Sequence, residues 1–214
     1  METDFSSMLN PGGVPCDENA NGCDTYSCEV ESLDEEISID EVYKAITLCK
    51  SGKSPGVDDI PVELYKNQTA MSVLCNLFNI CFNTGKVPQM WNKGIITPIP
   101  KSSTCDMRET LSFRGITLAP SSYKLYCSIL NARLSTWLDD RNIIHDEQNG
   151  FRPSRSTLDH LSTISNIIEG RKLRRQSTFA AFIDFKKAYD TVDRNLLFCK
   201  LESIGISSKR LNAV

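Results

Sequence analysis

Residues 179–184 read Phe179-Ala180-Ala181-Phe182-Ile183-Asp184, an apolar run that ends in a carboxylate. Its length and composition predict a central strand, buried on both faces of a sheet. The next residues, Phe185-Lys186-Lys187-Ala188-Tyr189-Asp190, place two lysines close to that acid. The patterns elsewhere are mostly helical, so we expect an α+β fold.

Asp184 is the residue whose chemistry needs an explanation. A carboxylate at the end of a buried strand is unfavourable unless it is paired, hydrogen-bonded or bound to a metal ion. One interpretation is that Asp184 binds Mg²⁺ while Lys186 and Lys187 attract a polyphosphate. The other is that Asp184 caps the turn and pairs with Lys186. Asp190 and Asp193 are weaker candidates, because Asp193 stands where the N-cap of a helix over 194–204 is expected.

Four helices are expected upstream of this stretch. Ser38-Ile39-Asp40-Glu41 indicates a capping box that opens the first helix. The second, over 69–83, ends near Gly85, and the third, over 120–141, has the clearest helical periodicity. The fourth spans 156–175. Its buried face is expected to consist of Leu158, Leu161, Ile164 and Ile168.

One extended segment is expected between the second and third helices. Residues 94–100 read Gly-Ile-Ile-Thr-Pro-Ile-Pro. Proline cannot donate a backbone hydrogen bond, so the two prolines favour an edge strand or a hairpin.

The charges divide the chain into an acidic start and a basic body. Residues 1–43 hold twelve of the 27 acidic residues and no Lys or Arg. The 24 basic residues that follow stand against 15 acids, a net charge of +9. This suits a polyanionic partner such as nucleic acid, although an ordinary solvated surface is equally compatible. Residues 1–36 are rich in Pro, Gly and Asn, which predicts disorder.

The nine cysteines and the hydropathy exclude several classes of protein. An odd number of scattered cysteines without an export signal predicts reduced thiols in an intracellular protein, with nucleus and cytoplasm undecided. Cys16, Cys23 and Cys28 lack the paired spacing of zinc knuckles, which favours an irregular acidic tail over a zinc site. No apolar run is long enough to cross a membrane.

Together with its flanks, the stretch 182–194 resembles the first palm motif of reverse transcriptases from non-LTR retrotransposons. Four further segments resemble motifs of that family, in the family's order. The first is Gly52-Lys53-Ser54-Pro55-Gly56-Val57-Asp58, with Ile60-Pro61 and Glu63, and the second is Trp91 with residues 94–101. The third is Phe113-Arg114-Gly115-Ile116-Thr117-Leu118, which continues to Leu134. The fourth is Gln148-Asn149-Gly150-Phe151-Arg152-Pro153, with residues 155–157 and Asp159.

The resemblance implies a right-hand polymerase fold. It covers the chain from about residue 38 to its end, and it implies helical fingers plus an incomplete ferredoxin-like palm. The expected divisions are an acidic segment over 1–36, fingers and fingers/palm helices over 37–177, and the start of the palm over 178–214. The family more often has Gly at the position of Asp59; if the backbone there needs a positive φ angle, Asp tolerates it better than most residues.

The resemblance also implies roles for individual residues. Asp184 would be catalytic and would bind Mg²⁺ together with the backbone carbonyl of Phe185. Tyr189 would lie beneath the sugar of the incoming dNTP, and Lys101 and Arg114 would grip its triphosphate. The track of the RNA template and DNA primer would be lined by Gln148, Gly150, Phe151, Arg152 and Arg155.

The family's metal site needs further carboxylates from a Tyr-X-Asp-Asp hairpin, and residues 1–214 contain no such motif. Asp139-Asp140 is the only Asp pair near an aromatic residue, and it is expected far from Asp184. The chain is therefore expected to be a polymerase fragment that does not extend a primer alone. Two alternatives stay open: a non-catalytic nucleic-acid-binding remnant of a mobile element, and a degenerate product without function.

Overall fold

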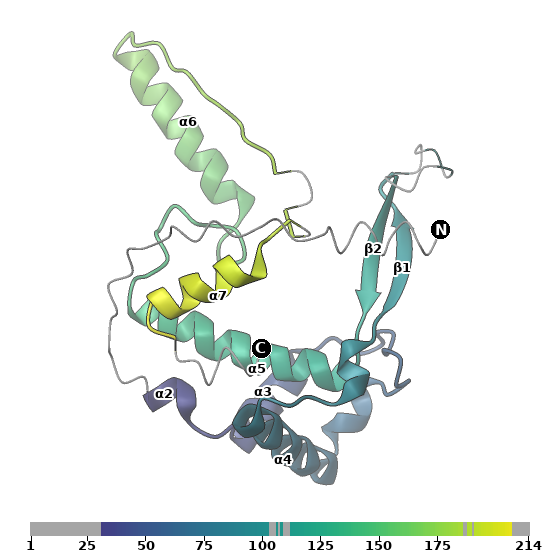
Figure 1. Ribbon diagram of the computed structural model, residues 1–214. Coiled ribbons are helices and arrows are strands. Elements are labelled where there is room, and N and C mark those ends of the chain that lie inside the picture. The colour runs from purple at the N-terminus through teal and green to yellow at the C-terminus, as the bar shows by residue number, and fades with distance from the viewer. Residues whose placement is uncertain are drawn as a thin grey trace. The chain divides into compact units, whose positions relative to one another are not determined.

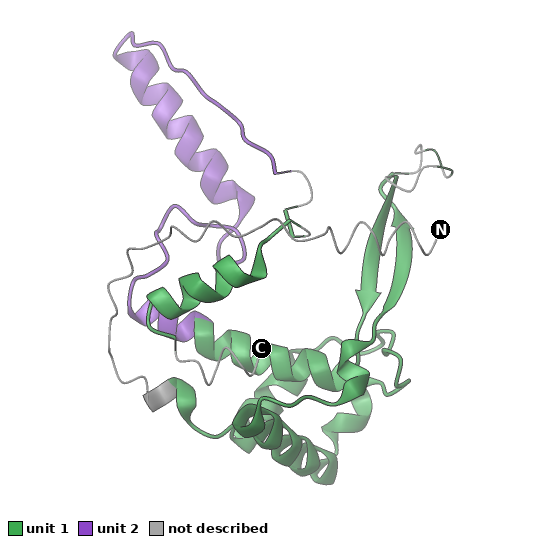
Figure 2. Cartoon of the chain, in the orientation of Figure 1, with its two compact units in different colours: residues 1–134, 188–214 green, residues 135–187 purple. Residues whose placement is uncertain are grey.

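The computed structural model describes residues 31–102, 106, 108, 112–185, 188–189 and 191–206. The chain divides into two compact units, residues 1–134 with 188–214 and residues 135–187 (Figure 2). The fold is a mixture of helices and one small antiparallel sheet (Figure 1). The elements are α2 (Glu31–Asp34), α3 (Ile39–Leu48), η1 (Val62–Lys66), α4 (Gln68–Thr84), η2 (Gln89–Asn92), β1 (Ile95–Pro100), β2 (Phe113–Leu118), α5 (Ser121–Asp140), α6 (Thr157–Leu173) and α7 (Arg194–Ser203).

The core of the first unit contains an aromatic cluster formed by residues of α4, η2 and α5. The ring of Phe78 lies 5.4 Å from that of Tyr126 and 6.1 Å from that of Trp91, measured between centroids. The Trp91 indole N–H donates to Ser122 Oγ at 2.9 Å, so its polar group is satisfied inside the core. Burial of these large rings supplies much of the apolar area that stabilises this unit.

The local signals for helix ends are confirmed. Ser38 and Glu41 form the expected capping box at the start of α3, and Asp193 caps α7. Gly85 ends α4 with φ +64°, a left-handed conformation that glycine adopts without a Cβ clash. Val42, Ala45 and Ile46 of α3 are buried, whereas Ile39 and Tyr43 are exposed.

Residues 31–37, which precede α3, already contain buried side chains, which corrects the disorder predicted from composition up to residue 36. Leu33 is 5% exposed and Ile37 is 2% exposed. The Ile37 N–H donates to Asn79 Oδ1 at 2.6 Å, and the Ile37 carbonyl accepts from Asn79 Nδ2 at 2.9 Å. The composition of the segment could not reveal this order, because it does not show that Leu33 and Ile37 are enough to anchor the segment to the first unit. The disorder predicted for residues 1–30 lies outside the described residues, as do Cys16, Cys23 and Cys28.

The two prolines at 98 and 100 do sit in a hairpin. Strand β1 pairs antiparallel with β2, and the register runs from Ile95 opposite Leu118 to Pro100 opposite Phe113. All of β1 is exposed, so the strand is held by its partner and by its ends rather than by a core.

The loop 52–58 is fixed against the turn that follows β2. A Cβ on Gly56 would lie 2.4 Å from the backbone nitrogen of Pro120, so only glycine allows this approach. The Gly52 N–H donates to Glu63 Oε1 at 2.6 Å, which closes the other end of the loop. Asp59 has φ +51°, which confirms that this position requires a left-handed backbone.

In the second unit, α6 has the predicted length but not the predicted burial. Its four periodic apolar residues, Leu158, Leu161, Ile164 and Ile168, are all exposed. The periodicity of a helix determines which side chains share a face, whereas burial requires a second element on that face. Within the described residues, no helix is long and apolar enough to cross a membrane.

The central strand expected over 179–184 does not form, and its burial was wrongly predicted. Residues 176–185 have no regular secondary structure, and Phe182 is 87% exposed. A strand needs a neighbour to accept its backbone hydrogen bonds, and the sheet in the described part of the chain contains β1 and β2 alone.

Candidate functional site

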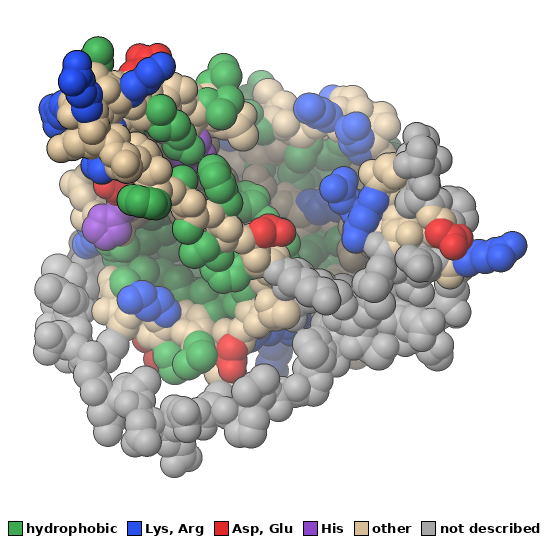
Figure 3. Space-filling model, turned by 90° about the horizontal axis from the view of Figure 1, so that it is seen from above, with side chains coloured by type: hydrophobic (Ala, Val, Ile, Leu, Met, Phe, Trp, Pro, Cys, Tyr) green, Lys and Arg blue, Asp and Glu red, His purple; other side chains and the backbone are tan. Residues whose placement is uncertain are grey.

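The β1–β2 hairpin brings Lys101 and Arg114 to one face. Arg114 is directly opposite Ile99, and the Lys101 N–H donates to the Ser112 carbonyl at 2.9 Å, which extends the ladder by one step. Side chains alternate along a strand, so residues 99, 101, 112 and 114 share a face. Both basic residues are exposed, and Lys and Arg side chains gather in the region of this hairpin (Figure 3).

The base of the hairpin is held by the aromatic core. Trp91 lies just before β1, and Tyr123 lies just after β2 in the first turn of α5. Their ring centroids are 5.7 Å apart, and both residues contact the cluster around Tyr126. The start of β1 and the end of β2 are therefore both attached to the aromatic core, which orients the face that carries Lys101 and Arg114.

A second group of predicted residues lies in one loop of the second unit, between α5 and α6. Arg152 Nη2 donates to Asp139 Oδ1 at 3.1 Å, and its Nη1 donates to the His145 carbonyl at 3.3 Å. Arg155 Nη2 donates to Asp146 Oδ1 at 2.8 Å. Both guanidinium groups, predicted to contact template or primer, are thus engaged by the loop itself and by the end of α5.

The other predicted residues of this loop form its tip. Gln148 Nε2 donates to the Gly150 carbonyl at 3.0 Å. Phe151 is 91% exposed and has φ +63°. The structure therefore gathers all five predicted track residues in a single loop.

Asp184 and Phe185 are exposed in the second unit and do not occupy the strand end predicted for them. Tyr189 is exposed and belongs, like Lys101 and Arg114, to the first unit. Asp193 is the N-cap of α7, as its position before the helix predicted.

The metal donors in the described part of the chain do not by themselves fit a two-metal site. Within the described residues, no three His, Cys, Asp or Glu side chains gather closely enough to hold a metal ion. A single solvated carboxylate binds Mg²⁺ weakly, since the ion retains its water unless several oxygen ligands are pre-arranged. Asp184 could supply one ligand of a larger set.

Arg133 makes several side-chain contacts within the first unit, and sequence patterns assigned it no separate role. It lies on α5 and forms a bidentate ion pair with Glu41 of α3. It also donates to the carbonyls of Glu35 and Glu36, at 2.7 and 3.0 Å. The signal that could have revealed it is an arginine within the apolar stripe of the helix over 120–141.

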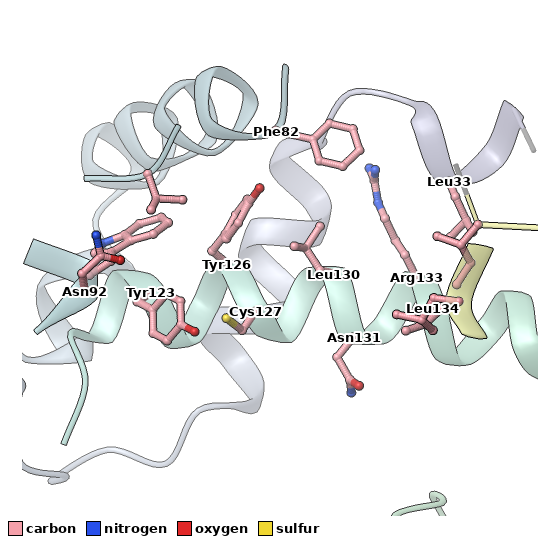
Figure 4. Close-up of a pocket in the computed structure, with 14 residues that line it drawn as sticks. Leu33, Phe82, Asn92, Tyr123, Tyr126, Cys127, Leu130, Asn131, Arg133 and Leu134 are labelled. Carbon is pink, nitrogen blue, oxygen red and sulfur yellow. The ribbon is translucent and has the colours of Figure 1, made fainter. Parts of the chain in front are cut away.

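Arg133 also borders an apolar cavity of about 320 Å³ along α5 (Figure 4). Tyr123, Tyr126, Cys127 and Leu130 line it from α5, and Leu33 lines it from α2. Burial raises the pKa of the Cys127 thiol, so this thiol stays protonated and weakly nucleophilic at neutral pH.

Comparison with known proteins identifies relatives over most of the chain. The family described as "Reverse transcriptase (RNA-dependent DNA polymerase)" matches residues 99–213, more than half of the 214 residues. A Xenopus laevis protein, "Transposon TX1 uncharacterized 149 kDa protein", is 25% identical over 93% of this chain and 15% of its own length.

Two Drosophila melanogaster proteins add to this. The "Probable RNA-directed DNA polymerase from transposon BS" is 26% identical over 78% of this chain and 19% of its own length. The "RNA-directed DNA polymerase from mobile element jockey" is 27% identical over 73% of this chain and 17% of its own length. The chain spans less than a fifth of the length of these three relatives. It belongs to the reverse transcriptase family of RNA-dependent DNA polymerases, with the polymerases of non-LTR retrotransposons among its relatives.

Proposed function

We propose that this chain is the fingers and the opening palm segment of a right-hand RNA-directed DNA polymerase, and that its hairpin binds the triphosphate of a dNTP. The observation that carries the proposal is the shared face of Lys101 and Arg114. Lys101 and Arg114 lie on the same exposed face of the hairpin as Ile99, which is opposite Arg114. The two cations make a small basic surface for an extended polyanion.

The two residues differ in what they offer a triphosphate. The planar guanidinium of Arg114 can donate two parallel hydrogen bonds to phosphate oxygens, whereas the ammonium of Lys101 acts as a mobile point charge. Trp91 and Tyr123 hold the base of the hairpin, and the backbone hydrogen bond from Lys101 to Ser112 holds its other end, so the two strands keep both groups on one face.

In the complete polymerase, Asp184 and the Phe185 carbonyl would be two of the Mg²⁺ ligands, and Tyr189 would lie beneath the sugar of the dNTP. The exposed apolar run over 179–184 supports a role in a longer polymerase, because Phe179, Phe182 and Ile183 lack a covering element among the described residues. Strands from a longer polypeptide would pair with it, bury these side chains and bring additional carboxylates to Asp184. The chain alone is accordingly proposed to be inactive.

Nucleotide binding tests the role of the hairpin. Titration of the chain with dTTP, followed by NMR or calorimetry, is expected to show binding that weakens at least tenfold in the Lys101→Ala and Arg114→Ala variants. Lys44→Ala, which removes an exposed lysine from α3, is the matched control and should bind like the unaltered chain. Equal affinity in all four proteins would refute the proposed role.

Primer extension tests the proposed incompleteness. With an RNA template, a DNA primer, dNTPs and Mg²⁺, we expect no product from this chain. Appreciable extension that is lost on Asp184→Ala would show that the catalytic site is complete. If the chain binds nucleic acid but not dTTP, it is instead a non-catalytic nucleic-acid-binding remnant. The lack of a metal-binding cluster around Asp184 among the described residues favours this alternative.

A further inference from the structure

Phe151 is held in a conformation that a phenylalanine seldom adopts. Its φ of +63° lies in the left-handed region, where the side chain approaches the backbone, and its ring is 91% exposed. Burial of the ring therefore does not offset the cost of the conformation. Ser154, three residues further on, also has a positive φ, of +61°.

The loop around Phe151 is braced on three sides. Arg152 bridges the loop to Asp139 at the end of α5. Arg155 pairs with Asp146 across the loop. Asn149 Nδ2 lies 3.2 Å from His160 Nδ1, which ties the tip to the first turns of α6. These contacts brace the backbone of the loop, so the point from which the Phe151 side chain projects is set before any partner arrives.

The same contacts remove most of the positive charge that could hold phosphates. Asp146 Oδ1 lies 2.8 Å from Arg155 Nη2 and 3.8 Å from Arg152 Nη1, so one carboxylate faces both guanidinium groups. Asp139 provides a second carboxylate for Arg152. The loop thus presents an aromatic face with its arginines already neutralised.

We propose that Phe151 is a stacking residue for an unpaired base of single-stranded nucleic acid, and that Arg152 and Arg155 position it. This proposal rests on the proposed polymerase function, which supplies the nucleic acid, and it assigns to this loop a stacking contact in place of phosphate contacts. An exposed flat ring on a braced backbone suits a base, because every base has a π face and stacking tolerates any sequence. Phe179 is equally exposed but lies in a segment without regular structure, so exposure alone does not single out Phe151.

Binding of the full chain to a fluorescein-labelled twelve-nucleotide single-stranded RNA, measured by anisotropy over a series of salt concentrations, tests the proposal. Phe151→Ala should weaken binding by about 5- to 150-fold, the range for loss of one base–aromatic stack. The slope of log affinity against log salt should stay unchanged, because no phosphate contact is lost. Phe151→Leu, which keeps apolar bulk without a π face, should weaken binding similarly.

Phe151→Trp should retain the affinity, and its added indole emission should be quenched when RNA binds. Leu173→Ala, which removes another exposed apolar side chain, is the control and should not change binding. Full affinity in Phe151→Ala or Phe151→Leu, or a shallower salt slope in either, would overturn the stacking role while the polymerase proposal stands. If the unaltered chain does not bind the RNA at all, both proposals fall.

Discussion

Arg133 and Glu41 form a two-pronged ion pair across 92 residues of sequence. Arg133 Nε lies 2.6 Å from Glu41 Oε1, and Nη2 lies 2.8 Å from Oε2. The same guanidinium holds the carbonyls of Glu35 and Glu36 and lies 5.7 Å from the centre of the Phe82 ring. One side chain of α5 thereby fixes the start of α3, the preceding turn and the C-terminal part of α4.

Arg133→Ala is expected to lower the free energy of unfolding by about 2–4 kcal/mol, because it leaves a half-buried carboxylate and two carbonyls without their donor. Urea unfolding at pH 7 measures this. Arg133→Lys should recover only part of the loss, since an ammonium cannot reproduce the fork. Lys124→Ala, on the exposed face of α5, should change stability by less than about 0.5 kcal/mol.

The Glu41 carboxyl predicts a pH dependence of stability. Partial burial alone would raise its pKa, but the hydrogen bonds from Arg133 and Ser38 outweigh this and lower the pKa from 4.5 to about 2. Since the folded-state pKa is depressed, the contribution is complete above about pH 4.5 and is lost as the pH falls towards 2.

Discounted for solvent screening, this contribution is about 1–2 kcal/mol. The difference in unfolding free energy between the unaltered chain and Glu41→Gln should therefore be constant above pH 5 and shrink below about pH 4. A difference that stays constant down to pH 2.5 would mean that the carboxylate does not depend on Arg133 for its ionisation.

Gly56→Ala tests the close approach of the 52–58 loop to the turn before α5. The new Cβ would lie within 2.7 Å of three backbone atoms of Ala119 and Pro120, so the backbone must move. We expect a loss of about 1–3 kcal/mol in the free energy of unfolding. In contrast, Gly170→Ala in α6 meets no atom within 4 Å and should be neutral or stabilising by up to ~1 kcal/mol.

Asp184→Ala should leave the stability of this chain within about 0.5 kcal/mol of the unaltered value, because the carboxylate is exposed on a segment without regular structure. Thermal unfolding with and without 5 mM Mg²⁺ provides the measurement. We expect no stabilisation by the ion in either protein. A rise in Tm with Mg²⁺ that Asp184→Ala abolishes would reveal a metal site despite the exposure of this residue.

The helix ends could be predicted from local sequence. The capping residues Ser38, Glu41 and Asp193 act on backbone groups only three residues away or closer, so their roles follow from neighbours along the chain. The length of α5 and the glycine that ends α4 follow from the same short-range rules. The order of the five motifs, likewise a property of the sequence alone, indicated the family that the comparisons then confirmed.

Features that depend on residues far apart in the sequence could be read from the folded chain alone. The shared face of Lys101 and Arg114 results from the register of β1 and β2. The ion pair of Arg133 with Glu41 joins residues 92 positions apart. The exposure of α6 follows because no element covers its apolar face among the described residues of its unit. The run 179–184 shows the same dependence most plainly. Its composition suits a buried strand, but backbone hydrogen bonding and burial are supplied by neighbouring strands, which no local pattern can provide.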